Sequence, residues 1–200
     1  MTITYTVGDG LYLNITNRCS NNCTFCVRSI QNSVGDADDL WLEREPALDE
    51  IITDINKRRL SAYEELVFCG YGEPLYRLAD VLEICEFVKE KTKGKLPIRI
   101  NTNGLADLIN SRPTAKETAN MADTISISLN APTPEKYNQL CRSEFGEQAF
   151  PAILAYAKEC KENGAEVTLT AVDVIPTDEL EACKKIANSI GVKFRVRESY

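Results

Sequence analysis

The sequence predicts an α/β fold: a partial (β/α)6 TIM-like barrel of parallel strands, open on one side, formed as a single domain over residues 1–200. Two observations lead to this prediction. Short runs of β-prone residues recur along the chain, and the segments between them carry apolar residues at helical spacing. Strands that alternate with helices imply parallel pairing and right-handed crossovers. A doubly wound open sheet is the alternative, because periodicity alone does not separate the two architectures.

The predicted strands are short and leave room for a helix between one strand and the next. In chain order they are Leu11–Thr16, Leu66–Cys69, Ile98–Asn101, Thr124–Asn130, Val167–Val172 and Val192–Arg197. In either architecture, ligands bind at the carboxyl ends of the strands. The residues that directly follow each strand are therefore the candidates for a functional site.

Four segments between the strands show an apolar helical face, and the first of these helices is expected to begin at Pro46. The four faces comprise Leu48, Ile51, Ile52 and Ile55; Leu78, Val81, Leu82, Cys85 and Val88; Phe150, Ile153, Leu154 and Ala157; and Leu180, Cys183, Ile186 and Ile190. Gly164 and Gly191 stand where the last two helices should end, as glycines at helix C-termini commonly do.

The composition excludes several classes of function. Acidic residues outnumber basic ones by 30 to 23, a formal charge of −7, and the one basic block, at 57–59, is predicted to end a helix. Nucleic-acid binding through phosphates is therefore disfavoured. The chain has no histidine, which excludes Ser-His-Asp and Cys-His catalysis and hydrolases with histidine-bound zinc.

The cysteine content bears on location. No apolar run approaches a membrane span, and the N-terminal residues lack a basic leader followed by an apolar stretch, so a cytoplasmic location away from membranes is expected. Thiols stay reduced there, and eight cysteines indicate metal binding or core packing before disulfides. Four of them share helical spacing with apolar residues and are predicted to pack in the core: Cys85, Cys141, Cys160 and Cys183.

Three other cysteines, Cys19, Cys23 and Cys26, follow the first strand at the spacing C-x3-C-x2-C. This spacing also fits one buried stripe of a helix, but the intervening Ser and Asn residues favour caps and turns. Close thiolates in a polar loop can hold a metal cluster, and three of them leave one iron of a cubane without a protein ligand. A zinc site is less favoured, because structural zinc takes four donors and histidine is absent.

This loop resembles the C-x3-C-x-Φ-C signature of radical S-adenosylmethionine (SAM) enzymes, with Phe25 at the aromatic position. The resemblance implies a 4Fe–4S cluster whose open iron binds the amino and carboxylate groups of SAM. It also implies an electron donor such as flavodoxin or ferredoxin, reductive cleavage of SAM to a 5′-deoxyadenosyl radical, and abstraction of hydrogen from an unknown substrate.

The stretch "CGYGEPL" follows the second predicted strand and resembles the family's Gly-Gly-Glu-Pro segment, which holds the SAM amino group. Here Tyr71 separates Gly70 from Gly72, which leaves open which backbone carbonyl faces SAM. The resemblance places Gly70, Gly72 and Glu73 near SAM, whereas an ordinary Gly/Pro turn explains the stretch without a ligand. Cys69 lies beside this segment and its role is open.

Further candidates follow the later strands. Asn103 lies in "NTNG", which resembles a turn of the family, and the resemblance assigns SAM contacts to Ser128 and Asn130, with Ser126 deeper. The alternative is that these side chains form a polar outer face. The remaining candidates are Arg142, for the SAM carboxylate, and Val174, for adenine. Arg195 and Arg197 share one face of the last strand; if they point inward, they favour an anionic substrate.

Within the family, "LYLNITNRCSNNCTFCVR" and "SISLNAPTPEKYNQLCR" resemble the small radical SAM proteins associated with TatD-type hydrolases, which implies a functional link to such a hydrolase. The rival enzymes are a glycyl-radical-enzyme activase and a 7-carboxy-7-deazaguanine-synthase-like enzyme. The rival of another class is a non-catalytic Fe–S or zinc module that binds or transfers electrons.

Overall fold

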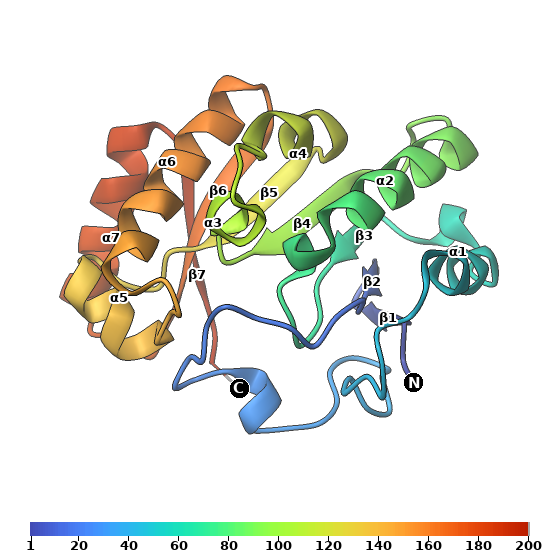
Figure 1. Cartoon of the computed structure of the whole chain (residues 1–200), viewed down its shortest axis with the longest axis horizontal. Helices are drawn as coiled ribbons and strands as arrows, with labels where there is room; N and C mark the ends of the chain where they lie inside the picture. Colours follow the sequence, from blue (N-terminus) through green and yellow to red (C-terminus); the bar gives the residue numbers. More distant parts are fainter. Residues whose placement is uncertain (200) are drawn as a thin grey trace.

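The computed structural model describes residues 1–199 and contains one seven-stranded sheet whose strands lie in chain order, β1 to β7 (Figure 1). The strands are β1 Thr4–Val7, β2 Gly10–Leu13, β3 Glu65–Phe68, β4 Ile98–Thr102, β5 Thr124–Ser128, β6 Glu166–Val172 and β7 Lys193–Arg197. All neighbours from β2 onwards pair in parallel. A doubly wound sheet would reverse its strand order, so this alternative is wrong and the partial barrel is confirmed.

The antiparallel strand β1 is an addition to the six predicted strands. It pairs with β2 across the two-residue turn Gly8–Asp9, in which Gly8 has a φ of 56°. Such tight hairpins favour glycine at positive φ. The alternation of polar and larger residues at 4–7, followed by Gly-Asp-Gly, is the sequence signal that predicts this hairpin.

The helices α1 to α7 are Leu48–Asn56, Leu78–Thr92, Ala106–Asn110, Ala115–Met121, Pro134–Cys141, Ala149–Glu162 and Thr177–Ile190. The 3-10 turns η1 to η4 are Val27–Ser29, Leu60–Ala62, Pro74–Arg77 and Gly146–Gln148. Pro46 precedes the cap of α1 instead of standing in its first turn. Gly191 ends α7 in the left-handed conformation, as predicted, and Gly164 follows the end of α6. Among residues 1–199, none of the helices combines the length and apolar character of a membrane span.

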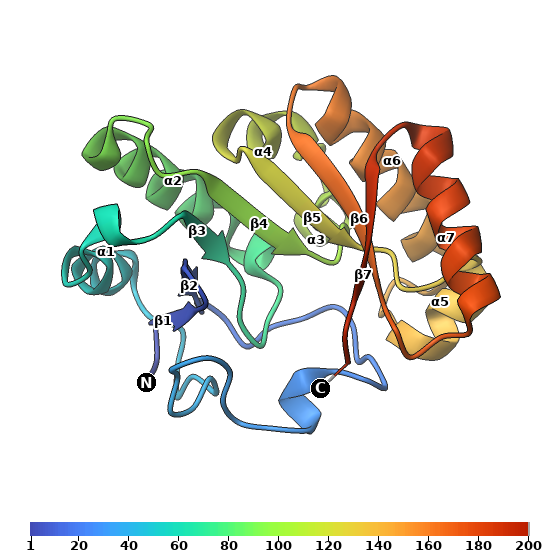
Figure 2. The same ribbon diagram turned by 180° about the vertical axis from the view of Figure 1, so that it is seen from behind.

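The two faces of the sheet differ in chemistry. One face, with Leu11, Leu66 and Ile125, packs against the helices in the main hydrophobic core. The predicted core cysteines Cys85, Cys141, Cys160 and Cys183 are buried free thiols, which confirms that prediction. In both views the helices lie on one side of the curved sheet, and the segment between β2 and α1 crosses the opposite, concave side (Figures 1 and 2).

The concave face is polar. Direct strand pairs place Ser126 beside Thr168, and Ser128 beside Thr170, on one face of the sheet. Arg195 pairs with Thr170 and Arg197 with Val172, so both arginines belong to this same face. Ser126 and Thr170 are buried. Ser126 and Ser128 therefore line the barrel interior, and the interpretation of a solvent-exposed polar face is wrong.

Candidate active site

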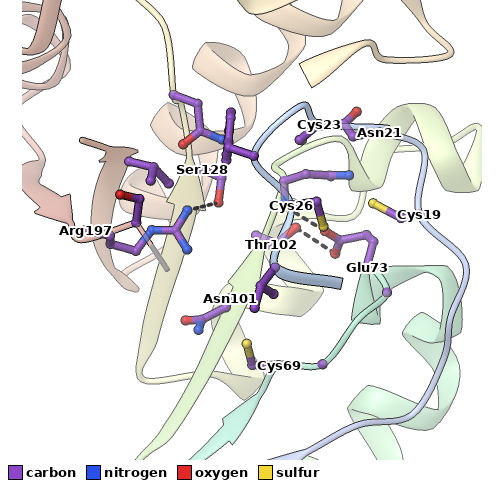
Figure 3. A pocket seen from close by; sticks show the side chains of 18 of the residues that line it. Cys19, Asn21, Cys23, Cys26, Cys69, Glu73, Asn101, Thr102, Ser128 and Arg197 are labelled. Carbon is purple, nitrogen blue, oxygen red and sulfur yellow. Dashed lines mark hydrogen bonds between the residues drawn. The ribbon is translucent and has the colours of Figure 1, made fainter. Parts of the chain in front are cut away.

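A cavity of about 200 Å³ lies where the strands β3 to β7 end (Figure 3). Its wall includes residues from the cysteine loop, the loop after β3 and the ends of the later strands. They are Cys19, Asn21, Cys23, Phe25, Cys26, Val27, Cys69, Gly70, Gly72, Glu73, Asn101, Thr102, Asn103, Ser128, Asn130, Val172, Arg197, Glu198 and Ser199. Figure 3 shows Cys19, Cys26 and Glu73 on one side and Ser128 and Arg197 on the opposite side.

The cysteine loop is held by backbone hydrogen bonds to the end of α5. The Asn22 N–H donates to the carbonyl of Cys141 and the Thr24 N–H to that of Leu140, both over 2.9 Å. The Asn21 amide group donates to the Tyr137 hydroxyl over 2.8 Å. Residues 17–26 contain no helix, so the three cysteines are not the buried stripe of one.

The three thiols line one cavity but are not gathered around a point. Within residues 1–199, no three cysteine, aspartate or glutamate side chains lie close enough to hold a metal ion. A hydrogen bond with Cys141, together with burial, raises the pKa of Cys23. Burial and the Glu73 carboxylate raise the pKa of Cys19 to about 12. In the metal-free chain these thiols are protonated at neutral pH, and iron binding would displace their protons.

The residues present fit an Fe–S cluster with a polar ligand beside it. Three cysteine sulfurs are suitable donors for iron, and all three border the cavity. Asn21 and Asn130 border it too, and both are buried. Their Oδ1 atoms have no hydrogen-bond partner within residues 1–199. Buried acceptors without a partner are costly, so both are suited to receive donors from a ligand.

Gly70 and Gly72 are required by close packing against the segment that leads to the cysteine loop. A Cβ at Gly72 would lie 2.6 Å from the Arg18 carbonyl oxygen and still closer to that of Thr16. At Gly70 it would lie 2.8 Å from the Asn14 Cγ and still closer to the Asn14 Oδ1. The Glu73 N–H also donates to the Arg18 carbonyl over 2.8 Å. The Gly-x-Gly pattern thus joins the two loops, and no ligand is needed to explain it.

Glu73 is buried and connects the loop after β3 to the end of β4. Its Oε1 accepts from the Thr102 hydroxyl over 2.8 Å and from the Leu75 N–H over 3.1 Å. Its Oε2 accepts from the Asn103 N–H over 2.6 Å. Burial raises the pKa of Glu73 to about 7, although these three hydrogen bonds act in the opposite direction.

This shift gives a pH-dependent stability. The carboxyl of Glu73 binds its proton more tightly in the folded chain, with a pKa of about 7 against an ordinary value of 4.5. The folded state therefore loses stability as pH rises from about 4.5 to 7, by on the order of 3 kcal/mol. We expect metal-free Glu73→Gln to lack this loss. In urea unfolding, the free energy of unfolding of the variant should therefore rise relative to that of the wild type between pH 5 and 7.5.

In Glu73→Gln the side-chain NH2 group faces a backbone N–H, and two donors that face each other lower the stability of the variant. This loss of stability does not vary with pH. Glu86→Gln, on the exposed side of α2, is the matched control and should keep the wild-type pH profile. A stability difference between wild type and Glu73→Gln that is equal at both pH values would contradict a titrating Glu73.

Asn103 and Ser128 are both in the cavity wall, but their hydrogen bonds differ. The Asn103 Nδ2 donates to the Ser20 hydroxyl over 2.9 Å, and its Oδ1 accepts from the Leu105 N–H over 3.0 Å. Asn103 therefore positions the cysteine loop. The Ser128 hydroxyl accepts from Arg197 over 3.2 Å and can still donate.

Three of the sequence-predicted residues do not border this cavity. Arg142 is exposed and follows the last residue of α5. Its backbone has a φ of 47°, and this left-handed conformation turns the chain at the end of the helix. Val174 lies beyond the end of β6 and is 42% exposed, whereas Val172, on the concave face, lines the wall. Ser126 lines a separate cavity of about 450 Å³, deeper in the barrel, as its place in the strand implied.

The cavity also contains residues that the sequence prediction did not assign. Asn101, Thr102 and Arg197 stand at the ends of β4 and β7, and Cys69 directly follows β3. The rule that ligands bind at the carboxyl ends of parallel strands would have included them. Thr102 points to Glu73 and not into open space, which only its hydrogen bond reveals.

Comparisons with known proteins identify the family and the fold of the chain. Residues 13–190 match the family model of the Radical SAM superfamily. Among solved structures, that of Streptococcus suis SuiB bound to precursor peptide SuiA superposes with a TM-score of 0.70 at 17% identity, over 96% of this chain and 39% of SuiB. At this identity the likeness shows the fold alone.

Two curated relatives are similar in sequence. The dual-specificity RNA methyltransferase RlmN of Hyphomonas neptunium is 31% identical over 149 residues, 69% of this chain and 36% of the relative. The probable GTP 3′,8-cyclase of Methanothermobacter thermautotrophicus is 31% identical over 146 residues, 72% of this chain and 42% of the relative. The chain spans less than half the length of either relative.

The family match extends from the end of β2 to the end of α7 and so includes the whole cysteine loop and most of the cavity wall. The chain therefore belongs to the radical SAM superfamily, whose members are enzymes that use a 4Fe–4S cluster and SAM.

Proposed function

We propose that Cys19, Cys23 and Cys26 hold the 4Fe–4S cluster of this chain and that SAM binds in the adjoining cavity. One observation carries the proposal: the three cysteines share a cavity wall with polar side chains that follow β3, β4, β5 and β7. When bound, the cluster supplies the electron that cleaves SAM to methionine and a 5′-deoxyadenosyl radical, which abstracts hydrogen from an unknown substrate.

The residues of the wall divide into two groups. Glu73 and Asn103 use their side-chain atoms on the protein itself and so shape the site. Asn130, Ser128 and Phe25 retain groups that a ligand can contact. We assign direct contacts with SAM to this second group, with the Asn130 Oδ1 as acceptor for a SAM donor.

We also propose that residues 1–200 form one radical SAM core domain and that a flavodoxin- or ferredoxin-type protein reduces the cluster. The eight cysteines are free thiols within the described residues. Free thiols support our proposal that the protein functions in a reducing compartment such as the cytoplasm. A functional link to a TatD-type hydrolase stays a prediction.

The test is anaerobic reconstitution with iron and sulfide, followed by reduction with dithionite in the presence of SAM. We expect 5′-deoxyadenosine and methionine to form in equal amounts, because each cleavage yields one of each. Liquid chromatography with mass detection measures both products, and samples without dithionite serve as the control.

Two outcomes would contradict the proposal. One is a chain that retains zinc in place of iron, as the non-catalytic module requires. The other is a reconstituted, reduced cluster that leaves SAM intact.

A further inference from the structure

A second cavity, of about 570 Å³, lies next to the first on the concave face of the sheet. The two share wall residues, among them Val27, Cys69, Asn101 and Arg197. A molecule in the second cavity would therefore lie beside any ligand of the first. The second cavity is bounded by β1 and β2 on one side and by β7 on the other.

The cavity is cationic although the chain is acidic. Its wall contains Arg99, Arg195 and Arg197 against one carboxylate, Glu198, in a chain of formal charge −7. Positive charge concentrated in a cleft of an acidic protein indicates a ligand of negative charge. The cluster and SAM, which we assign to the first cavity, do not account for the excess of positive charge in the second.

The three arginines are not equivalent. Arg99 forms an ion pair with Glu65 over 2.6 Å and donates to the Asn101 amide oxygen and the Tyr12 hydroxyl, so its charge is largely compensated. Arg197 donates to Ser128 over 3.2 Å. The backbone of Arg195 pairs with β6, but its guanidinium group forms no ion pair or hydrogen bond within the part of the chain that the structure describes. Its guanidinium group is thus the group that can bind an anion bidentately.

The other wall of the cavity is apolar and comes from the segment between β2 and α1. Val27, Val34 and Leu40 line it together with Tyr5 and Tyr71. These residues belong to a hydrophobic cluster that attaches the segment to the first hairpin. The Tyr71 hydroxyl donates to the Gln31 carbonyl and fixes the segment further.

The segment between β2 and α1 and the volume of the second cavity bear on the size of its ligand. In Figures 1 and 2 the segment crosses the concave side from the first hairpin toward the end of β7. The second cavity, of about 570 Å³, has a volume typical of a small-molecule site.

We propose that the substrate of this enzyme is a small anionic molecule with an apolar part, bound in the second cavity. Its carboxylate or phosphate group contacts Arg195, and its apolar part packs against Val27, Val34 and Leu40. The inference rests on the proposed function in one respect, that the bound anion is the enzyme's substrate. Binding of the anion itself does not require the cluster.

Chemical modification of arginine tests the proposal. Phenylglyoxal reacts with accessible arginines, and both Arg195 and Arg59 are exposed. Arg59 borders neither of the two cavities and serves as the control within the same molecule. Peptide mass spectrometry follows both rates on the full reconstituted chain, with inorganic phosphate, benzoate or neutral benzamide present at matched ionic strength.

We expect phosphate or benzoate to slow modification of Arg195 by about fivefold when its concentration is four times its dissociation constant, and to leave Arg59 unchanged. Protection by phosphate alone identifies a phosphorylated ligand, and protection by benzoate alone identifies a carboxylate. Benzamide should not protect. A rate of modification at Arg195 that neither phosphate nor benzoate slows, or equal protection of Arg59, would overturn the proposal.

A second measurement uses equilibrium dialysis of whichever anion protects. Arg195→Gln should weaken its binding by at least about fivefold, and Arg59→Gln should leave it unchanged. Weakening by both variants, or by neither, would overturn the proposal. The same dialysis on a chain without iron separates the two proposals, because loss of SAM cleavage would leave anion binding intact.

Discussion

Joint replacement of Cys19, Cys23 and Cys26 by alanine is expected to remove the cluster completely. After anaerobic reconstitution the wild type should hold about four irons per chain and the variant none, because no other group of cysteines in the sequence is closely spaced. Formation of 5′-deoxyadenosine should fall to background in the variant. Iron and sulfide assays and absorbance near the thiolate-to-iron charge-transfer band measure the loss of the cluster, and product analysis measures the loss of 5′-deoxyadenosine.

The control for this triple variant is Cys183→Ala. Cys183 is fully buried in α7 and does not border the cavity. Its replacement removes one sulfur atom from the core, at a cost of about 1 kcal/mol, and should leave the iron content unchanged. Iron retained at wild-type level by the triple variant would mean that other ligands hold the metal.

Gly72→Ala is expected to have the second largest effect. The new Cβ would collide with the carbonyl oxygens of Thr16 and Arg18, which are backbone atoms and cannot rotate away. Relief requires the two loops to separate, and the hydrogen bond between the Glu73 N–H and the Arg18 carbonyl would break. We expect a loss of about 3 kcal/mol in the free energy of unfolding, at the upper end of the cost of overpacking.

The same change should also lower the yield of reconstituted cluster, because the displaced segment leads directly to Cys19. Urea unfolding and iron content are measured in parallel. Gly94→Ala is the control: its φ of 68° makes alanine strained by about 1 kcal/mol, but nothing lies within 4 Å of the new Cβ. Full iron content and wild-type stability in Gly72→Ala would contradict the packing described for this loop.

Much of the fold could be predicted from the sequence because it depends on local patterns. The spacing of Leu78, Val81, Cys85 and Val88 predicts a helix, and this helix is α2. The short helices α3, α4 and α5 and the strand β1 were not among the predicted elements. The helices α3 and α4 have five and seven residues, too short for a helical repeat to stand out.

The site was predictable in part for a similar reason. Cys19, Cys23 and Cys26 are close in the chain, so their joint presence in one wall follows from their spacing. Arg142 and Val174 are different cases. Val174 follows β6 by two residues, and Arg142 stands at the end of α5, where the backbone is left-handed. Whether such a side chain returns to the strand ends depends on the turn that carries it.

Local sequence was thus sufficient to establish the order of strands and helices and the cysteine loop, because these depend on residues a few positions apart. The assembled fold was needed to show that Cys23 meets Cys141, that Gly72 faces Arg18, and that Arg195 stands beside an apolar wall from residues 27–40. These contacts join segments far apart in the chain. Their geometry is set by how the sheet curves and how its strands register, and no local pattern encodes that.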